Sequence, residues 1–544
     1  MKYITVTIKE YQDAISKNLD VISSDKVSVE LDFNKTIINK TEKIVNQLKL
    51  EKILNQFNLP LYLYSSLLFH IKFYIIQKVF EDEIELRSGR KIYKKTKNKF
   101  FKKKNLIISL LNLLKNHTFF LVDIFTIIFF LILVLIRSLK NKKIFLASFP
   151  GSGLGDFLIN KKLNFNTLFL VSDVNKSLIT NIFEFIIGGQ YLPFYPRKLH
   201  CKNYISLNLI FELNDKRLNL NKLNSIINYW ASQRKRDLLI SKIIAKIIKP
   251  KIFISQQSLD QYAIFAYSFK LLNIPSLLIS HGSHVVNIDL LAKKEWKNHS
   301  LTIFDGPFSF TAIQTPAAKY FHKTEKLISK PINTGPLILC KTNDSFKIPN
   351  RKELFGEFYQ KKILLYASTP KMINNLRPLI YETEDEYINN LIIFINSIKN
   401  RDDIHLAIRH RDTESLDCTE LSRILPKSNN YKIYTNGKFE DYLLMSDILI
   451  SYSSTTIEQA LFSNIKVLLW DSLGRYKHFD EFSIEEKVSR GIWFASNNNL
   501  SQILDEALQF NLSHHKNTFQ TAYIDYLNET KNFNLSNLLK LDLN

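Results

Sequence analysis

Short apolar runs alternate with helical patterns along the chain after residue 140. The first five runs are KIFLAS (143–148), TLFLVS (167–172), KIFISQ (251–256), SLLIS (276–280) and LTIFD (301–305). Five more follow a break near residues 341–356, namely KILLYAS (362–368), IHLAIR (404–409), YKIYT (431–435), DILIS (447–451) and KVLLW (466–470). Buried strands that alternate with helices are typical of the βα units of a parallel sheet. The pattern therefore predicts an α/β protein with two halves, residues 141–340 and 341–544, the second ending in helices.

Residues 1–105 follow a different pattern and are rich in lysine. KYITVTI (2–8) and KVSVELDF (26–33) have the alternation of strands, whereas the stretches near 40–57 and 60–80 have helical periodicity. We expect a basic N-terminal extension of mixed α+β or helical structure. No catalytic constellation is visible in it.

An apolar segment, TFFLVDIFTIIFFLILVLI (118–136), follows this extension and is interrupted only by Asp123. Its length is close to the ~20 residues that span a bilayer. Basic stretches flank it at 87–104 and 137–143, which favours attachment to an anionic leaflet. We expect residues 106–140 to form a membrane-associated helical segment, and whether it spans the membrane or lies on it stays open. A buried helix of a core is the alternative.

Composition narrows the class of protein. With 544 residues, 45% of them hydrophobic and 23% charged, the chain is long enough for two or three folded domains. Its formal net charge of +23 favours partners that carry negative charge, such as an anionic membrane or phosphorylated substrates. Nucleic acid is disfavoured because the basic residues are spread along the chain and no reading module is present. The three cysteines are far apart, so neither a zinc site nor a disulfide framework is expected.

A glycine-rich loop follows the first predicted strand. In SFPGSGLGDFLI (148–159), Gly151, Gly153 and Gly155 would let backbone N–H groups approach an anion at the start of a helix. The spacing is not that of the dinucleotide-binding fingerprint. A tight turn without a ligand is the alternative.

A histidine directly follows another predicted strand. In LLISHGSHVVNID (277–289), His281 comes at the strand end, and Gly282 behind it permits an unusual backbone angle. An imidazole in this place can accept a proton from a hydroxyl near neutral pH. A hydrogen-bonded histidine that only caps the strand end is the alternative.

Strand ends in the second half carry small hydroxyls and cations. Ser368 and Thr369 follow one strand, and Arg409 and His410 follow the next. Ligands of open parallel sheets bind beyond the carboxyl ends of the strands, where these side chains could contact phosphate oxygens. Alternatively, these residues are ordinary solvated side chains at strand ends that bind no ligand.

A hydroxyl-rich turn lies between two apolar runs in SDILISYSSTTIEQALFSNIKVLLWD (446–471). Thr455 and Glu458 have the spacing of a capping box, which would account for both residues without a ligand. The same turn at a helix start also suits a diphosphate, with Glu458 accepting hydrogen bonds from a ribose. Both interpretations stay open at this point.

The order of these motifs, from about residue 250 to 475, resembles that of GT-B glycosyltransferases. The resemblance is to bacterial surface-polysaccharide transferases and to the CDP-glycerol glycerophosphotransferase group. It rests on six segments in the same order: the strand ending in His281-Gly282, TPAAKYFHK (315–323), INTGPLIL (332–339), ILLYASTP (363–370), AIRHRD (407–412) and DILISYSSTTIEQAL (447–461). Ser280, Ser451 and His410-Arg411 depart from the usual pattern of the group.

The resemblance implies two Rossmann-like domains, an acceptor domain at 141–340 and a nucleotide-donor domain at 341–544, with the active site between them. By it, His281 is the general base and Asp156 is the rival base. The donor contacts that it implies are Gly335, Ser368, Thr369, Arg409, His410, Ser453, Ser454 and Thr455, with Glu458 on the ribose. The acceptor loop would be Gly151, Gly153 and Gly155.

The expected function is transfer of a sugar from a nucleotide-activated donor to a glycan or lipid-linked acceptor in surface polysaccharide synthesis. No metal and no cofactor are expected, because cationic and hydroxyl groups can stabilise the departing diphosphate. A cytoplasmic location at the inner leaflet of the membrane is expected. The alternatives are a polyol-phosphate transferase, a sugar-nucleotide epimerase and a non-catalytic scaffold for glycan assembly.

Overall fold

The computed structural model describes two long stretches of the N-terminal half and most of the C-terminal half. The described residues are 24–88, 218–280, 286–287, 303–325, 327–339, 349–367, 382–412, 416–474, 476–477 and 490–533, with short pieces between 124 and 169. Two parallel sheets and a helical N-terminal extension lie within these stretches.

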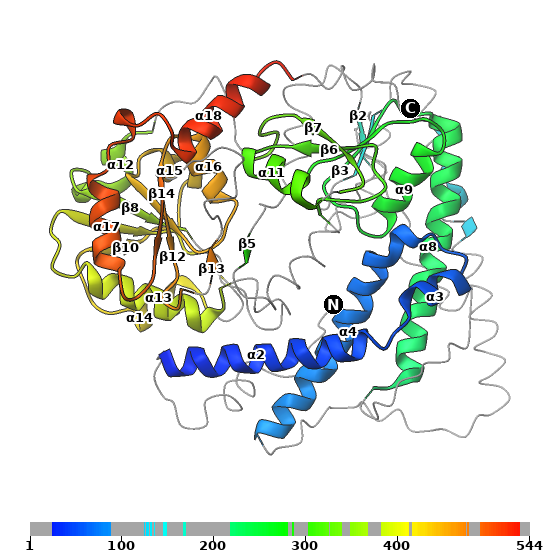
Figure 1. Ribbon diagram of the computed structural model, residues 1–544, viewed down its shortest axis with the longest axis horizontal. Coiled ribbons are helices and arrows are strands. Elements are labelled where there is room, and N and C mark those ends of the chain that lie inside the picture. Colours follow the sequence, from blue (N-terminus) through cyan, green and yellow to red (C-terminus); the bar gives the residue numbers. More distant parts are fainter. Residues whose placement is uncertain are drawn as a thin grey trace.

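Six parallel strands form the first sheet (Figure 1). They are β1 (Phe145–Ser148), β2 (Thr167–Phe169), β3 (Phe253–Ser255), β4 (Ser276–Leu278), β6 (Phe310–Ile313) and β7 (Lys330–Asn333). Their order is β2-β1-β3-β4-β6-β7. Helix α9 (Gln261–Lys270) connects β3 to β4, and α11 (Pro316–Glu325) connects β6 to β7. We refer to this unit as the first domain.

A second sheet of six parallel strands comes later in the chain, in the order β10-β9-β8-β11-β12-β14. Its strands are β8 (Lys362–Tyr366), β9 (Ile404–Ile408), β10 (Tyr431–Ile433), β11 (Ile448–Ser451), β12 (Lys466–Trp470) and β14 (Ile492–Ala495). Its helices are α12 (Arg351–Phe355), α13 (Glu384–Ser397), α14 (Cys418–Ile424), α15 (Phe439–Leu444), α16 (Thr456–Phe462), α17 (Leu500–Gln509) and α18 (Phe519–Thr530), with short 3-10 turns at Gly356–Phe358 and Leu512–His514. This unit is the second domain. The prediction of an α/β protein with two parallel sheets is confirmed.

One predicted strand is wrong, and three strands of the two six-stranded sheets were not predicted. LTIFD (301–305) does not contribute a strand, because its residues 303 and 304 lie in a turn. The carboxylate of Asp305 accepts the backbone N–H of Ile328 at 3.0 Å, which fixes this turn against the segment before β7. Within these two sheets, the strands that the sequence did not predict are β6, β7 and β14.

The N-terminal extension is helical where it is described. It contains α2 (Ser24–Val45), α3 (Leu50–Gln56), a 3-10 turn (Leu61–Leu63) and α4 (Tyr64–Ser88). KVSVELDF is therefore part of a helix, and the strand prediction for it is wrong. Phe33 and Ile37 lie one helical turn apart in the same buried cluster, so packing outweighs the strand preference of the β-branched residues.

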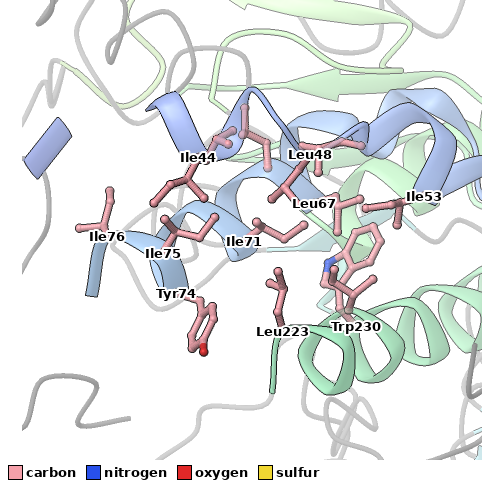
Figure 2. Close-up of a cluster of buried hydrophobic side chains, with 14 of the residues drawn as sticks. Ile44, Leu48, Ile53, Leu67, Ile71, Tyr74, Ile75, Ile76, Leu223 and Trp230 are labelled. Atoms are coloured by element: carbon pink, nitrogen blue, oxygen red, sulfur yellow. The ribbon is translucent and has the colours of Figure 1, made fainter. Parts of the chain in front are cut away.

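This extension shares its core with the first domain. Figure 2 shows side chains of α2 and α4 packed on the long helix α8 (Leu220–Ile248), with Trp230 of α8 beside Leu67 of α4. The cluster continues to Ala263 and Ile264 of α9. The extension is therefore docked on the first domain by apolar burial.

Three elements connect the two domains. The C-terminal helix α18 reaches from the second domain to β6, where Tyr526 Oη donates to the carbonyl of Ile313 at 2.7 Å (Figure 1). Helix α2 of the extension contacts α13 of the second domain. A short antiparallel pair joins β5 (Val286–Asn287) to β13 (Tyr476–Lys477).

The apolar segment at 118–136 is described in part. Its described positions between 124 and 136 are helical. Among the residues that the structure describes, no helix is both long enough and apolar enough to cross a membrane.

Candidate functional site

The hydroxyl-rich turn lies at the carboxyl edge of the second sheet, between β11 and α16. Ser451 is fully buried at the end of β11, and its Oγ donates to the carbonyl of Ala367 at the end of β8 at 2.8 Å. Ser454 Oγ accepts the backbone N–H of Thr456 at 3.3 Å. Ser453, Ser454 and Thr455 are partly exposed. The turn is thus fixed at its base while its hydroxyl side chains reach the surface.

Glu458 does not form the capping box that its spacing with Thr455 suggested. The side chain of Thr455 makes no capping hydrogen bond to α16. Glu458 is instead fully buried, and its Oε2 accepts a hydrogen bond of 2.5 Å from Tyr523 Oη of α18. Burial and the nearby Glu458 carboxylate raise the pKa of Tyr523 well above its usual range, so the phenol keeps its proton and donates. Glu458 therefore anchors α18, and its contact to a ribose stays a prediction.

Arg409 follows β9 and organises the neighbouring loop. Its guanidinium donates to the carbonyls of Tyr434 at 3.0 Å, Asn436 at 2.7 Å and Gly437 at 3.1 Å, and lies 4.7 Å from the centre of the Tyr442 ring. These bonds hold the loop after β10 at the carboxyl edge. Because they use only part of the five N–H groups of arginine, Arg409 is still able to contact a phosphate.

The structure places His410 in the core of the second domain, and its predicted phosphate contact stays a prediction. The His410 side chain is fully buried, and its two ring nitrogens lie 3.1 Å from Tyr387 Oη and 3.0 Å from the carbonyl of Leu416. Both nitrogens are thereby engaged within the core. His410 thereby fastens the loop after β9 to α13.

Buried carboxylates at the same edge were not predicted from the sequence. Glu382 and Glu386, at the start of α13, and Asp471, after β12, are all almost completely buried. Burial raises the pKa of Tyr366 well above its usual range, and these three carboxylates raise it further. The run TEDE at 383–386 was the available signal, since acidic residues after a threonine are typical of a helix start.

Gly335 lies on the facing edge, directly after β7 of the first domain. Its φ is +68°, and a Cβ there would lie 2.3 Å from Thr530 Oγ1 of α18. Glycine is therefore needed for the approach of the C-terminal helix. Its contact to a donor phosphate stays a prediction.

The two carboxyl edges meet near the hydroxyl turn. Tyr452, the residue before Ser453, is buried against Ile303 and Phe304 of the first domain. The ring of Phe304 also packs edge-on against Phe321 of α11, at 5.6 Å between ring centres. The turn at 453–455 consequently adjoins the contact between the domains. A substrate that touches both domains would bind there.

Several predicted residues lie outside the described residues. They are His281, Asp156, Ser368, Thr369 and the glycines Gly151, Gly153 and Gly155. Of the other predicted residues, the structure brings Arg409, Ser453, Ser454, Thr455 and Glu458 to one edge of the second sheet and places Gly335 at the opposing edge. Within the described stretches, no group of three or more histidine, cysteine or acidic side chains is placed to hold a metal.

No protein-family model matches the chain, and no curated protein is similar to it in sequence. Among solved structures, it is similar to the UDP-GlcNAc 2-epimerase from Neisseria meningitidis bound to UDP-GlcNAc, at 12% identity and a TM-score of 0.44 over 73% of this chain and 100% of that one. It is also similar to a glycosyltransferase from Rickettsia africae, at 14% identity and a TM-score of 0.39 over 73% of this chain and 96% of that one. The S. aureus MnaA-UDP structure matches at 13% identity and a TM-score of 0.41 over 70% of this chain and 91% of that one. These TM-scores lie below 0.5, so they carry no conclusion about this chain, whose two parallel sheets and bridging helix α18 are described above.

Proposed function

We propose that this chain is a GT-B glycosyltransferase that moves a sugar from a nucleotide-activated donor to a glycan or lipid-linked acceptor. The observation that carries the proposal is the position of the hydroxyl turn at 453–455. It lies at the carboxyl edge of a parallel sheet, beside the contact with the first domain, which is where open α/β folds bind ligands.

The second domain would hold the donor. Departure of the nucleotide leaves negative charge on its phosphates, and groups placed in advance lower the energy of that state. Ser453 and Thr455 offer hydroxyl donors, and Arg409 offers a cation on the adjoining loop. We assign the transfer no metal, because these groups supply the stabilisation.

The first domain would hold the acceptor. The acceptor hydroxyl attacks the anomeric carbon, the bond from that carbon to the nucleotide breaks, and a base takes the proton of the hydroxyl. His281 follows β4 at the edge of the first sheet and remains the predicted base, with Asp156 as its rival.

Membrane attachment is part of the proposal. Ile127, Phe129 and Leu131 of the apolar segment pack on the same core cluster as residues of α8 and α9. The apolar segment, α8 and the turn after α9 also expose apolar side chains, namely Phe125, Ile128, Ile132, Leu239, Ile247, Leu271 and Leu272. The exposed Lys242, Lys246 and Lys270 accompany them. Apolar side chains together with lysines fit an anionic bilayer, and we assign this surface to the cytoplasmic leaflet, where lipid-linked acceptors are found.

A turnover assay separates the proposed function from its rivals. The full-length protein is incubated with UDP-N-acetylglucosamine, GDP-mannose or CDP-glycerol, with octyl glycosides as acceptors, and the products are followed by NMR. Release of free nucleotide with a glycosylated product supports the transferase. A sugar nucleotide inverted at one carbon with no nucleotide released identifies an epimerase, and a glycerol phosphate product identifies the polyol-phosphate transferase. No reaction with any donor, by folded protein, favours the scaffold.

A further inference from the structure

Exposed apolar side chains gather at the amino edge of the first sheet, where its parallel strands begin. Ile247 lies shortly before β3, and Ile328 lies shortly before β7. Leu271 and Leu272 lie between α9 and β4. At 77%, Ile328 is the most exposed large apolar residue in the described part of the chain. Because β3, β4, β6 and β7 are neighbours in that order, the four residues border one edge, and we call them the amino-edge patch.

The segments that carry this patch are basic. Lys249 and Lys251 precede β3, and both are exposed. Lys270 ends α9 and Lys330 begins β7, and both of these are exposed as well. Among the described residues from the ends of α8, α9 and α11 to the next strand, Glu325 is the acidic residue. Lysines around exposed apolar side chains are complementary to an anionic bilayer, in which the apolar groups insert while the lysines contact the headgroups.

The apolar segment at 118–136 packs beside the patch. Three of its side chains pack on the core cluster that contains Phe269 and Ile274. Phe269 and Ile274 flank the two leucines of the patch in the chain. The exposed side chains of the apolar segment, such as Phe125 and Ile128, therefore extend the same apolar region.

The candidate site lies at the opposite edge of this sheet. Tyr526 of α18 donates to the carbonyl of Ile313, which is the last residue of β6. Tyr452, next to the hydroxyl turn, is buried against Ile303 and Phe304 of the first domain. The second domain therefore contacts the carboxyl edge, whereas the patch lies at the amino edge.

The lengths of the elements set the distance between the two edges. Helix α9 begins near the carboxyl end of β3 and returns to the amino end of β4, because these strands are parallel neighbours. Its 10 residues span about 15 Å at a rise of about 1.5 Å per residue. A bilayer at the patch therefore lies about 15 Å from the carboxyl edge, and the hydroxyl turn at 453–455 lies on the far side of that edge.

We propose that the amino edge of the first sheet rests on an anionic bilayer and that the acceptor is a lipid-linked glycan that is already several sugars long. The acceptor class rests on the proposed transferase function, whereas the orientation on the bilayer does not. A sugar next to the lipid phosphate stays at the membrane surface and cannot reach the hydroxyl turn, but the far end of an extended glycan can. The protein thus elongates a glycan, and a transferase that works at the membrane surface must supply its first sugars.

The orientation is tested without any substrate. Full-length protein with Cys201, Cys340 and Cys418 replaced by serine receives one new cysteine, either Ile328→Cys or Lys438→Cys. Lys438 is exposed in the loop after β10, at the carboxyl edge of the second sheet. Each variant is labelled with bimane and added to vesicles of phosphatidylglycerol and phosphatidylcholine that are brominated close to the headgroup. We expect strong quenching of the label at Ile328→Cys and little at Lys438→Cys. A label at Ile328→Cys that is quenched no more than the one at Lys438→Cys would overturn the proposal.

A matched pair of variants tests the patch itself. Ile328→Ser should weaken binding to the same vesicles about tenfold, because a buried isoleucine side chain is lost from the contact. Leu444→Ser, at an exposed leucine of α15 in the second domain, should bind like the wild type. Unchanged binding of Ile328→Ser would overturn the proposal and would leave the patch to a protein partner.

The acceptor class is tested by the reach that the reaction needs. The octyl glycoside that reacts in the turnover assay is remade in two forms that stay in vesicles, with its sugar joined to diacylglycerol either directly or through a poly(ethylene glycol) spacer longer than α9. We expect the directly joined sugar to react at least about tenfold more slowly than the spaced one, because its hydroxyl is held away from the donor. Equal rates for the two forms would overturn the proposed acceptor class. If no octyl glycoside reacts while the label at Ile328→Cys is quenched, the transferase and its acceptor are rejected and the orientation is supported.

Discussion

Gly335 and Gly356 share a positive φ but differ in what surrounds them. At Gly335 a Cβ would meet Thr530 Oγ1 at 2.3 Å, whereas at Gly356 nothing lies within 4 Å. Both alanine variants incur the backbone strain of about 1 kcal/mol, but only Gly335→Ala also pushes on α18. We expect Gly335→Ala to lower the unfolding midpoint clearly more than Gly356→Ala in urea titrations. Equal effects of the two variants would mean that α18 does not pack on Gly335.

His405 makes stability depend on pH. Burial lowers its pKa from 6.5 to about 4, with the charges of Lys361 and Lys432 contributing. Well above pH 6.5 the His405 imidazole is unprotonated in both the folded and the unfolded chain. Between pH 6.5 and 4 the unfolded chain binds a proton more readily, so stability falls as the pH falls, by about 3 kcal/mol at most.

Urea unfolding at pH 7.5 and 4.5 measures this loss. The His405→Gln variant should lose less stability over the same interval, because its side chain does not titrate. A variant with the same pH dependence as the wild type would contradict the assignment to His405.

At the residue scale, the sequence located the segments of the candidate site correctly, but it did not predict the contacts of each side chain within them. Thr455 and Glu458 have capping-box spacing, yet the capping box in the structure is at Thr383 and Glu386. Glu458 is diverted by Tyr523, which is 65 positions away in the chain. Local spacing carries no information on such a distant partner.

At the element scale, α18 is one of the elements that hold the two domains together. Tyr523 donates to a buried carboxylate of its own domain, and Tyr526 donates to a carbonyl of the first domain. Tyr523→Phe deprives a buried charge of its donor and should cost about 2–3 kcal/mol, whereas Tyr526→Phe removes a neutral bond and should cost about 1 kcal/mol.

The midpoint of chemical unfolding ranks the two variants. Limited proteolysis distinguishes them further, because Tyr526→Phe should expose the link between the domains without unfolding the second sheet. If Tyr526→Phe left the cleavage pattern unchanged, the bond from α18 to the first domain would not hold the two domains together. If Tyr526→Phe were the more destabilising variant, the ranking of the two bonds would be wrong.

Strands were predicted where apolar runs are continuous, as in IHLAI and KVLLW. Strand β7 was not predicted, because KPIN is short, polar and mostly exposed at the edge of its sheet. The first turns of helix α2 were predicted to be a strand, because Val27 and Val29 alternate with polar residues as in a strand. The helical spacing of the apolar residues begins only with Phe33 and Ile37. Edge positions and packing against other helices are not encoded in short windows of sequence.

At the scale of the whole molecule, the apolar and basic side chains on α8 and α9 test attachment to a membrane. Leu272 and Leu444 are similarly exposed, at 41% and 38%, but Leu444 lies in α15 of the second domain. We expect Leu271→Ser with Leu272→Ser to weaken binding to vesicles of phosphatidylglycerol and phosphatidylcholine about tenfold or more, because each buried leucine contributes about 2 kcal/mol. Leu444→Ser is the control and should bind normally.

Co-sedimentation with such vesicles gives the partition coefficient. Lys242→Glu with Lys246→Glu should weaken binding at low salt and have less effect at high salt, since lysines contribute about 1 kcal/mol each near an anionic surface. Wild-type protein that stays in the supernatant with all vesicle compositions would contradict the attachment.

The central claim is that the hydroxyl turn after β11 holds the phosphates of a nucleotide donor. Calorimetric titration of the full-length protein with UDP, GDP, ADP, CDP and CMP tests it most directly, repeated on Thr455→Val and on Ser463→Ala at the opposite end of α16. The account predicts selective binding of one nucleotide, weakened about tenfold by Thr455→Val and unchanged by Ser463→Ala. Folded wild-type protein that binds none of these nucleotides, or Thr455→Val that binds as tightly as the wild type, would contradict it.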